Sequence, residues 1–215
     1  MTTSNPVERT MPTPNHHAHY PGFAGVGGLL AALTFTVGRA ADADLAIRLT
    51  GAGPGDHVVD VGCGPGVAVR RAAASAASVV GVDPAPVMLR VARPLTRPRT
   101  SSAVRYLAGS AEALPLPHDS ATVLWSLATV HHWRDLDAGL DEALRVLRPS
   151  GRLLAIERCV EPGARGQASH GWTDDQARMF AERCRSAGFA EAEIGHHQSR
   201  PGRRVVSVLA HRVGR

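Results

Sequence analysis

The sequence contains no lysine. All 24 basic residues are arginines, and with 19 acidic residues the formal net charge is +5. A basic chain can bind nucleic acid, but these arginines are scattered, and the tightest groups, at 70–71, 93–99 and 200–204, hold only two or three each. A solvated, arginine-rich surface is therefore favoured over a nucleic-acid interface.

Cysteine and aromatic residues are also scarce. The three cysteines, Cys63, Cys159 and Cys184, are widely spaced and form no CxxC pair. An odd number at such spacings predicts neither a disulfide framework nor a zinc site, and it fits the reducing cytoplasm, which we predict as the location. Because only 4% of the residues are aromatic, the core must consist mainly of Ala, Val and Leu.

Long hydrophobic runs are limited to one segment, residues 22–38, which is uncharged but interrupted by glycines. It is shorter than the roughly 20 residues that a membrane-spanning helix needs. It also lacks the basic start and the small-residue cleavage site of a signal peptide. We interpret it as a buried or site-covering helix and predict no membrane span.

The length of 215 residues predicts one domain with a full hydrophobic core. Residues 1–20 are polar and interrupted by prolines and histidines, so we predict a disordered arm, with the histidines at 16–19 solvated rather than bound to metal. The single domain then covers 21–215. It divides into a helical cover at 21–50, a core at 57–158, and a helix and hairpin at 159–215.

Within the core, short apolar runs alternate with helical patterns. We predict strands at 57–62, 79–83, 104–109, 121–128 and 152–158, and helices at 67–76, 85–95 and 135–147. Such alternation is typical of a parallel sheet covered by helices on both faces. A further helix at 173–187 precedes two strands, at 190–197 and 205–212, that form an antiparallel hairpin. The predicted fold is α/β, a doubly wound, mostly parallel sheet of seven strands.

The strongest chemical signal is "VVDVGCGPG" at 58–66, in which Gly62, Gly64 and Gly66 follow a strand. Glycines allow the backbone to turn sharply and to lie against a ligand, close to the start of the next helix. The spacing is G-x-G-x-G, which differs from the G-x-G-x-x-G of dinucleotide binders. Asp60 at the strand end suits a cationic group better than a pyrophosphate.

Asp83 ends the second strand, 21 residues after Gly62. A carboxylate at this position can accept hydrogen bonds from both hydroxyls of a ribose. Because NAD and S-adenosylmethionine both carry such a ribose, Asp83 alone leaves both cofactors open.

Four stretches occur in a consistent order: "VDVGCGPG", "VDPAPVML", "GSAEALPLPHDSATVLWSLATVHHW" and "ALRVLRPSGRLLAIE". Together they resemble the motifs of class I S-adenosylmethionine-dependent methyltransferases, in particular the small enzymes related to C-methylation in ubiquinone and menaquinone biosynthesis. The resemblance covers about residues 57–158. It implies a Rossmann-like fold, S-adenosylmethionine as cofactor, and methyl transfer to a small-molecule acceptor at O, C or N.

The resemblance also implies a set of cofactor-binding residues: Asp60, Gly62, Cys63, Gly64, Gly66, Asp83, Pro84, Met88, Ser110, Ala111, Glu112 and Ser126. Met88 lies where the family places a thioether on the adenine, although a core role is the alternative. Ser110 departs from the pattern, which has an aspartate for the adenine amino group there, and backbone groups at Ala111 could still contact the adenine edge. Cys63 is expected to be a packed side chain rather than a nucleophile, and a cofactor contact for Glu112 is left open.

In "ATVHHW" at 128–133, the resemblance falls on His131, at the start of the fourth helix. It is our candidate catalytic residue, as a general base, although a structural role at the helix start is favoured. We predict no metal site, because adjacent histidines do not share one face of an ordinary helix and no acidic or cysteine partner is suitably spaced. Glu157 ends the fifth strand, either facing the acceptor or paired with an arginine.

Two other functions stay open. One is a regulatory or scaffold protein that binds S-adenosylmethionine without turnover, and the other, less favoured, is an RNA methyltransferase. The expected partner is a small-molecule acceptor, with no nucleic acid, and the sequence does not indicate an oligomeric state. The segment 22–38 is a hypothetical lid, so deleting residues 1–38 should abolish turnover while leaving part of the cofactor affinity.

Overall fold

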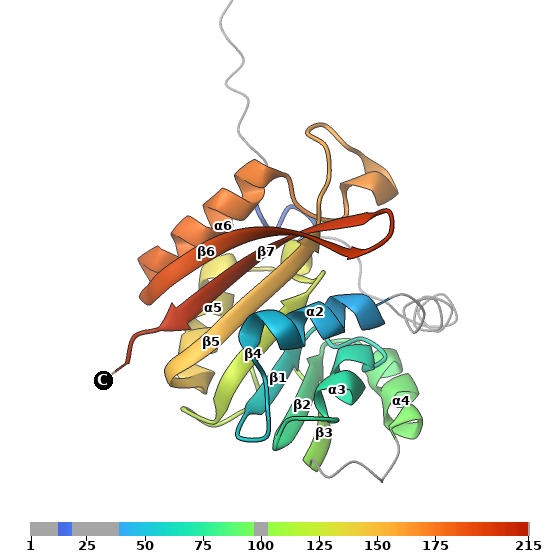
Figure 1. Cartoon of the computed structure of the whole chain (residues 1–215), viewed down its shortest axis with the longest axis vertical. Helices are drawn as coiled ribbons and strands as arrows, with labels where there is room; N and C mark the ends of the chain where they lie inside the picture. Colours follow the sequence, from blue (N-terminus) through green and yellow to red (C-terminus); the bar gives the residue numbers. More distant parts are fainter. Residues whose placement is uncertain (1–12, 19–38, 97–102, 215) are drawn as a thin grey trace, which may run out of the picture.

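The structure, a computed structural model, describes residues 13–18, 39–96 and 103–214. Seven strands form one sheet in the order β3-β2-β1-β4-β5-β7-β6 (Figure 1). The first five strands are parallel, whereas β7 is antiparallel to both β5 and β6. The strands are β1 His57–Val61, β2 Ser78–Asp83, β3 Ala103–Ala108, β4 Ala121–Leu127, β5 Leu147–Arg158, β6 Phe189–Arg200 and β7 Arg203–Arg212. This topology confirms the predicted fold class.

Helices cover both faces of the sheet (Figure 1). They are α2 Ala40–Thr50, α3 Val67–Ala72, α4 Pro86–Leu95, α5 Leu136–Val146 and α6 Asp174–Ala187, with short 3-10 helices η1 Val130–His132 and η2 Gly166–Ser169. One apolar core joins α5 and α6 to the sheet, and a second joins α2, α3 and α4 to its other face. Valine, alanine and leucine make up most of both cores, as the composition predicts.

The order of the strands creates one position at which the chain reverses direction across the sheet. From β1 the chain runs outward to β2 and β3, and it then returns to β4 on the other side of β1. The helices that follow β1 and β4 therefore lie on opposite faces. In open α/β sheets, ligands bind at such a switch point, beyond the carboxyl ends of the strands.

Several boundaries differ from the predicted ones. Helix α3 ends at Ala72, four residues early, and β5 begins at Leu147, five residues before the predicted start of that strand at 152. Ser150 has a φ of 62°, and the pairing register between β4 and β5 shifts next to this segment. His131 lies in η1 instead of at the start of α5. A single 3-10 turn leaves no periodic pattern, so the sequence could not indicate it.

Residues 13–18 depart from the predicted disordered arm, because they are held against the domain. The indole Nε1 of Trp172 donates to the Pro14 carbonyl at 2.8 Å, and the Asn15 amide donates to the Trp133 carbonyl at 3.1 Å. The backbone N–H of His17 donates to the His131 carbonyl at 2.8 Å. The composition of this segment could not reveal these long-range contacts.

The rest of the predicted arm and the candidate lid at 22–38 lie outside the described residues. Within the described ranges, no helix has both the length and the apolar character that a membrane span requires. The predicted C-terminal helix is confirmed. Thr173 and Gln176 form a capping box at its start, and Gly188 adopts the left-handed conformation at its end.

Candidate functional site

The glycine loop after β1 lies at the switch point of the sheet. Gly62, Gly64 and Gly66 have φ values of 74°, 52° and 76°, in the left-handed region that favours glycine. A Cβ at Gly62 would lie 2.6 Å from the Thr129 side chain, whereas one at Gly64 would meet nothing within 4 Å. Thr129 thus closes one side of the loop, and the other side is open to a ligand.

Asp83, at the carboxyl end of β2, lies across from this loop. Its Oδ2 accepts from the Gly64 N–H at 2.8 Å, and its Oδ1 accepts from the Ala85 N–H at 2.9 Å. Burial raises the pKa of the Asp83 carboxyl, and these two hydrogen bonds oppose the rise. The carboxylate therefore joins the loop to β2 and stands at the edge of the site.

Asp60, in β1, is almost fully buried. Burial raises the pKa of its carboxyl to about 7, the neighbouring Asp83 adds to the rise, and the Arg39 guanidinium opposes it. Because an ionised Asp60 is poorly solvated here, a bound cation would stabilise its charged form.

A pocket lies beside Asp60, and it is lined by Arg39, Asp42, Asp60, Gly62, Cys63, Pro65, Val67, Ala68 and Leu127. Arg39 donates to the Leu127 carbonyl at 2.7 Å. The helix that follows Arg39 is held to the sheet by a partly buried ion pair between Asp42 and Arg203, in which the nitrogen and oxygen lie 2.9 Å apart. Sequence reasoning missed Arg39, because a single arginine before a helix belongs to no motif.

Cys63 lies in the glycine loop, and its side chain packs inward. A Cβ at Gly81 would approach the Cys63 sulfur to 2.8 Å, which shows how closely that atom lies against β2. Burial raises the pKa of the thiol well above its usual value. These observations support the interpretation of Cys63 as a packed side chain.

On the α4 side of the site, Met88 is 1% exposed and packs with Val87 in a small apolar cluster separate from the two main cores. Pro84 is exposed, and Ala111 is buried. Ser110 follows β3 and bridges to Ala113. Their roles toward a cofactor stay predictions.

Glu112 contacts the backbone before α5. Its Oε1 accepts from the Arg134 N–H at 2.6 Å and from the Asp135 N–H at 3.3 Å. The side chain thereby connects the turn after β3 to the segment before α5, and its contact with a cofactor stays a prediction.

Two side-chain hydrogen bonds connect the end of β4 to β1. Ser126 is fully buried, and its hydroxyl lies 2.6 Å from that of Thr129, which donates to the Val61 carbonyl at 3.0 Å. Ala128 between them has a φ of 56°, a strained conformation for alanine. The strained turn directs the chain from β4 into η1.

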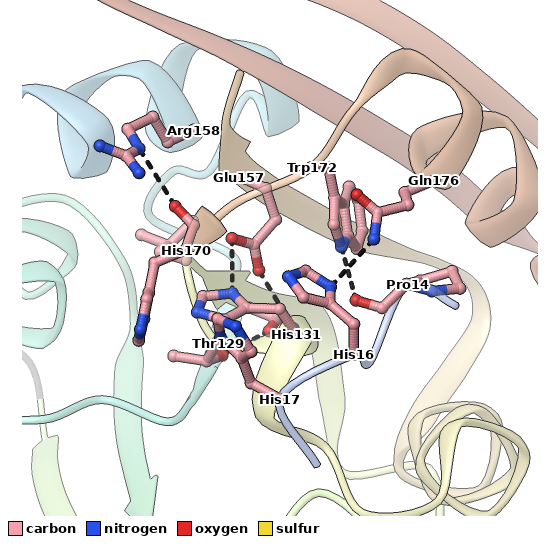
Figure 2. A network of polar contacts seen from close by, with 12 residues as sticks. Pro14, His16, His17, Thr129, His131, Glu157, Arg158, His170, Trp172 and Gln176 are labelled. Carbon is pink, nitrogen blue, oxygen red and sulfur yellow. Dashed lines mark hydrogen bonds and ion pairs between the residues drawn. The ribbon is translucent and has the colours of Figure 1, made fainter. Parts of the chain in front are cut away.

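His131 forms a buried pair with Glu157, at the end of β5. Its Nδ1 lies 2.8 Å from Glu157 Oε2, and its backbone N–H donates to Oε1 at 3.4 Å. The side chains are 3% and 0% exposed, and Figure 2 shows the contact between them. Of the two alternatives given for Glu157 from the sequence, neither included a histidine partner.

Three further histidines surround this pair. His17, His131, His132 and His170 each place a potential ligand atom within 4.8 Å of the others. Figure 2 shows His17 and His170 converging on His131 from different segments of the chain. Burial and the neighbouring imidazoles lower the pKa of His132 to about 3 and that of His17 to about 4, and they also lower the pKa of His170. The sequence revealed only the adjacent pair, because His17 and His170 lie far away along the chain.

Comparison with known proteins gives the site a context. A family model described as a methyltransferase domain matches residues 59–155. The chain is 36% identical to a malonyl-acyl-carrier-protein O-methyltransferase from Serratia marcescens, over 58% of this chain and 48% of that protein. It is 32% identical to a demethylmenaquinone methyltransferase from Tropheryma whipplei, over 52% and 46%. The chain thus spans about half the length of the curated relatives that it matches.

Two solved structures share the fold over most of their length. The cyclase SpnF has a TM-score of 0.73 at 19% identity, covering 95% of this chain and 98% of SpnF. An S-adenosylmethionine-dependent methyltransferase from Aquifex aeolicus has a TM-score of 0.70 at 18% identity, covering 86% and 98%. At these identities the likeness establishes the fold alone.

Proposed function

We propose that the chain is an active class I S-adenosylmethionine-dependent methyltransferase that methylates a small-molecule acceptor, and the matching methyltransferase domain and relatives support this proposal. The observation that carries this proposal is the pairing of Asp60 and Asp83 around the open glycine loop at the switch point. A buried carboxylate that lines a pocket, Asp60, and a second one bound to the glycine loop, Asp83, suit a cofactor that bears both a positive charge and a ribose.

The residues fit S-adenosylmethionine better than they fit a dinucleotide. A buried carboxylate at Asp60 would be unfavourable beside a pyrophosphate, and it becomes favourable beside an ammonium or sulfonium group. Asp83 is placed to accept from the ribose hydroxyls. Arg39, which lines the same pocket, is positioned to pair with the carboxylate of the methionine part. We propose these three residues as the polar anchors of the cofactor.

When bound, S-adenosylmethionine supplies an activated methyl group on a sulfonium. The main task of the chain is then to hold the acceptor in line with that group, which alone can lower the barrier by roughly 7–11 kcal/mol. The acceptor would lie beyond β4 and β5, where η1 and the loop after β5 border the site. Thr129 separates the glycine loop from His131 and so stands between the two halves of the site.

His131 remains the candidate general base for an acceptor that must lose a proton. Its Nδ1 is engaged by Glu157, which orients the ring and leaves Nε2 as the nitrogen able to take a proton. The same buried pair also supports a purely structural role. An acceptor that is already nucleophilic would need no base.

A turnover screen tests the proposal. The full-length chain would be incubated with S-adenosylmethionine carrying a labelled methyl group and with panels of phenols, amines and carbon acids, followed by mass spectrometry. We expect S-adenosylhomocysteine to form together with one labelled product. Tight cofactor binding without any labelled product, even with a cell extract as the source of acceptor, would contradict the proposal.

That negative result would favour the second candidate, a protein that binds the cofactor without methyl transfer. One observation keeps this candidate open, because the structural neighbour SpnF is described as a cyclase. The fold therefore does not by itself dictate methyl transfer. Variants with Arg39→Ala and Asp83→Asn should lose cofactor affinity in both cases, so only turnover separates the two functions.

A further inference from the structure

We propose that His17, His131, His132 and His170 bind one divalent transition-metal ion of the zinc class. This inference does not require methyl transfer, and it revises the expectation of no metal site. A metal on Nε2 of His131 would prevent that ring from acting as a general base, so the two proposed roles of His131 exclude each other. The expectation of no metal site considered His131 and His132 alone on an ordinary α-helix. In the structure both lie in the 3-10 helix η1, and two histidines from distant segments complete the group.

The geometry is close to that of a coordination sphere. The four potential ligand atoms all lie within 4.8 Å of one another. In a tetrahedral site with Zn–N distances of about 2.1 Å, ligand nitrogens lie about 3.4 Å apart, so an inward shift of about 1 Å per side chain would complete the site. Changes in side-chain rotamers can supply such a shift without moving a strand. Four imidazoles favour Zn²⁺, Co²⁺, Ni²⁺ or Cu²⁺, whereas Mg²⁺ and Ca²⁺ prefer oxygen ligands.

Glu157 supplies the outer support that metal-binding histidines usually have. Its carboxylate holds Nδ1 of His131 at 2.8 Å, which fixes the tautomer whose Nε2 lone pair can bind a metal. His17 contacts the Ser169 hydroxyl through Nε2 at 3.1 Å, so Nδ1 is the nitrogen that it would present. Both rings are thereby oriented by a contact on the side that faces away from the metal.

A carboxylate beside the cluster suits a cation. Glu157 is fully buried, and its Oε2 lies 2.8 Å from Nδ1 of His131. A divalent ion bound by the four rings would therefore sit close to a buried acidic group, whereas that group would repel an anion.

The segment that carries His17 is fixed in place by contacts outside the cluster. His16 contacts the Ser169 carbonyl at 2.9 Å through Nε2, and its Nδ1 lies 2.9 Å from the Gln176 amide. The Trp172 indole holds Pro14. Because the segment is already bound to the loop after β5 and to α6, placing His17 costs the metal site little conformational entropy. Through His17, a bound ion would hold residues 13–18 against the proposed acceptor side of the site.

Metal titration of the full-length, tag-free chain tests the proposal. The protein would be treated with a chelator, dialysed, and titrated with Zn²⁺ against a chromophoric competitor, with Co²⁺ absorption as a report on coordination and Mg²⁺ as a mismatched ion. We expect one Zn²⁺ per chain, intense visible Co²⁺ bands, and no competition by Mg²⁺. Zn²⁺ should also raise the melting temperature of the chain and slow proteolytic cleavage within residues 13–18.

Variants locate the site. His132→Ala and His170→Ala should each weaken Zn²⁺ binding at least tenfold and remove the gain in melting temperature, with circular dichroism used to check the fold of each. Glu157→Gln, which keeps the shape of the side chain, should weaken binding about 10–100-fold. His118→Ala and His196→Ala change exposed histidines outside the cluster and serve as matched controls.

Two results would overturn the proposal. One is a wild-type chain that takes up no Zn²⁺ at micromolar concentrations, in which case the cluster is only a packed group of neutral imidazoles. The other is binding that falls equally in the cluster variants and in the control variants. Neither result depends on turnover, so the proposed methyltransferase activity would stand or fall separately.

Discussion

The two halves of the site are built in different ways. Most of the proposed cofactor half comes from one stretch, from Asp60 in β1 to Asp83 at the end of β2, whose shape follows from glycines with positive φ, and Arg39 joins it from outside this stretch. The proposed acceptor half combines three segments, which hold His17, the pair at 131–132, and His170. A local sequence motif can therefore specify the first half, whereas only tertiary packing creates the second.

The difference has a physical cause. A glycine-rich turn between a strand and a helix fixes its own backbone, so its function is visible in nine residues. The histidine cluster depends on the Trp172–Pro14 hydrogen bond and on the pairing of His131 with Glu157. We therefore expect changes in the acceptor half to lower mainly the free energy of unfolding. Changes in the cofactor half should lower mainly the affinity for S-adenosylmethionine.

The largest effect is expected from His131→Ala. The change removes the imidazole partner of the fully buried Glu157 carboxylate and leaves it only the backbone N–H of residue 131, and breaking a buried pair in this way costs about 3–5 kcal/mol. Urea denaturation should show this loss in the free energy of unfolding, with His118→Ala as an exposed control. Unchanged stability together with intact cofactor affinity and lost turnover would contradict the structural role and favour a general base.

A smaller effect, now on affinity, is expected from Gly62→Ala. Its Cβ would lie 2.6 Å from Thr129 in a backbone conformation with φ 74°. Strain of this kind costs about 1–3 kcal/mol, so affinity for S-adenosylmethionine should fall about 5–150-fold in calorimetry. Gly55→Ala is the matched control, because a Cβ there meets nothing within 4 Å. Equal affinity in both variants would show that the loop does not form the site.

The sequence predicted the glycine loop after β1 and the seven-stranded sheet because both depend on local periods and glycine positions. The alternation of strands and helices specified β1 to β5, and the Thr173 cap marked the start of α6. It missed Arg39, Thr129 and the His131–Glu157 pair, since each acts through a contact with a distant segment. The departure of residues 13–18 from the predicted arm has the same origin.

The affinity for the cofactor is expected to depend on pH through the Asp60 carboxyl. With a pKa of about 7, Asp60 is mostly protonated at pH 6 and mostly ionised at pH 8. If the cofactor binds the ionised form, affinity should rise about tenfold over this range, with a proton released on binding. Calorimetry in buffers of different ionisation enthalpy measures both. Asp60→Asn should abolish the dependence, and a rise of equal size in that variant would exclude Asp60 as its source.

Ionisation of Asp60 has the opposite effect on the stability of the chain without cofactor, which it lowers. A carboxyl whose pKa is higher in the folded chain than in the unfolded one binds more protons when folded. Its stabilising contribution is complete below pH 3.8 and is lost as the pH rises through about 7. Without cofactor, Asp60→Asn should therefore be more stable than the wild type at pH 8, and the difference should shrink toward acid pH. Thermal unfolding at several pH values checks this.

The smallest effect is expected from Ser110→Asp, which restores the acidic residue that the resemblance predicts for the adenine amino group. One added hydrogen bond contributes about 0.5–1.5 kcal/mol net, so binding of S-adenosylmethionine should tighten about twofold to tenfold. Ser110→Ala separates this gain from a change in packing, and it should leave affinity nearly unchanged. A loss of affinity in Ser110→Asp would show that the adenine lies elsewhere.

The central claim is that the glycine loop, Asp60 and Asp83 form a site for S-adenosylmethionine. Calorimetric titration of the full-length chain with S-adenosylmethionine, and separately with NAD, tests it most directly. The account predicts saturable binding of one S-adenosylmethionine per chain, weakened by Asp83→Asn, and no measurable binding of NAD. Binding of NAD with no binding of S-adenosylmethionine would contradict it.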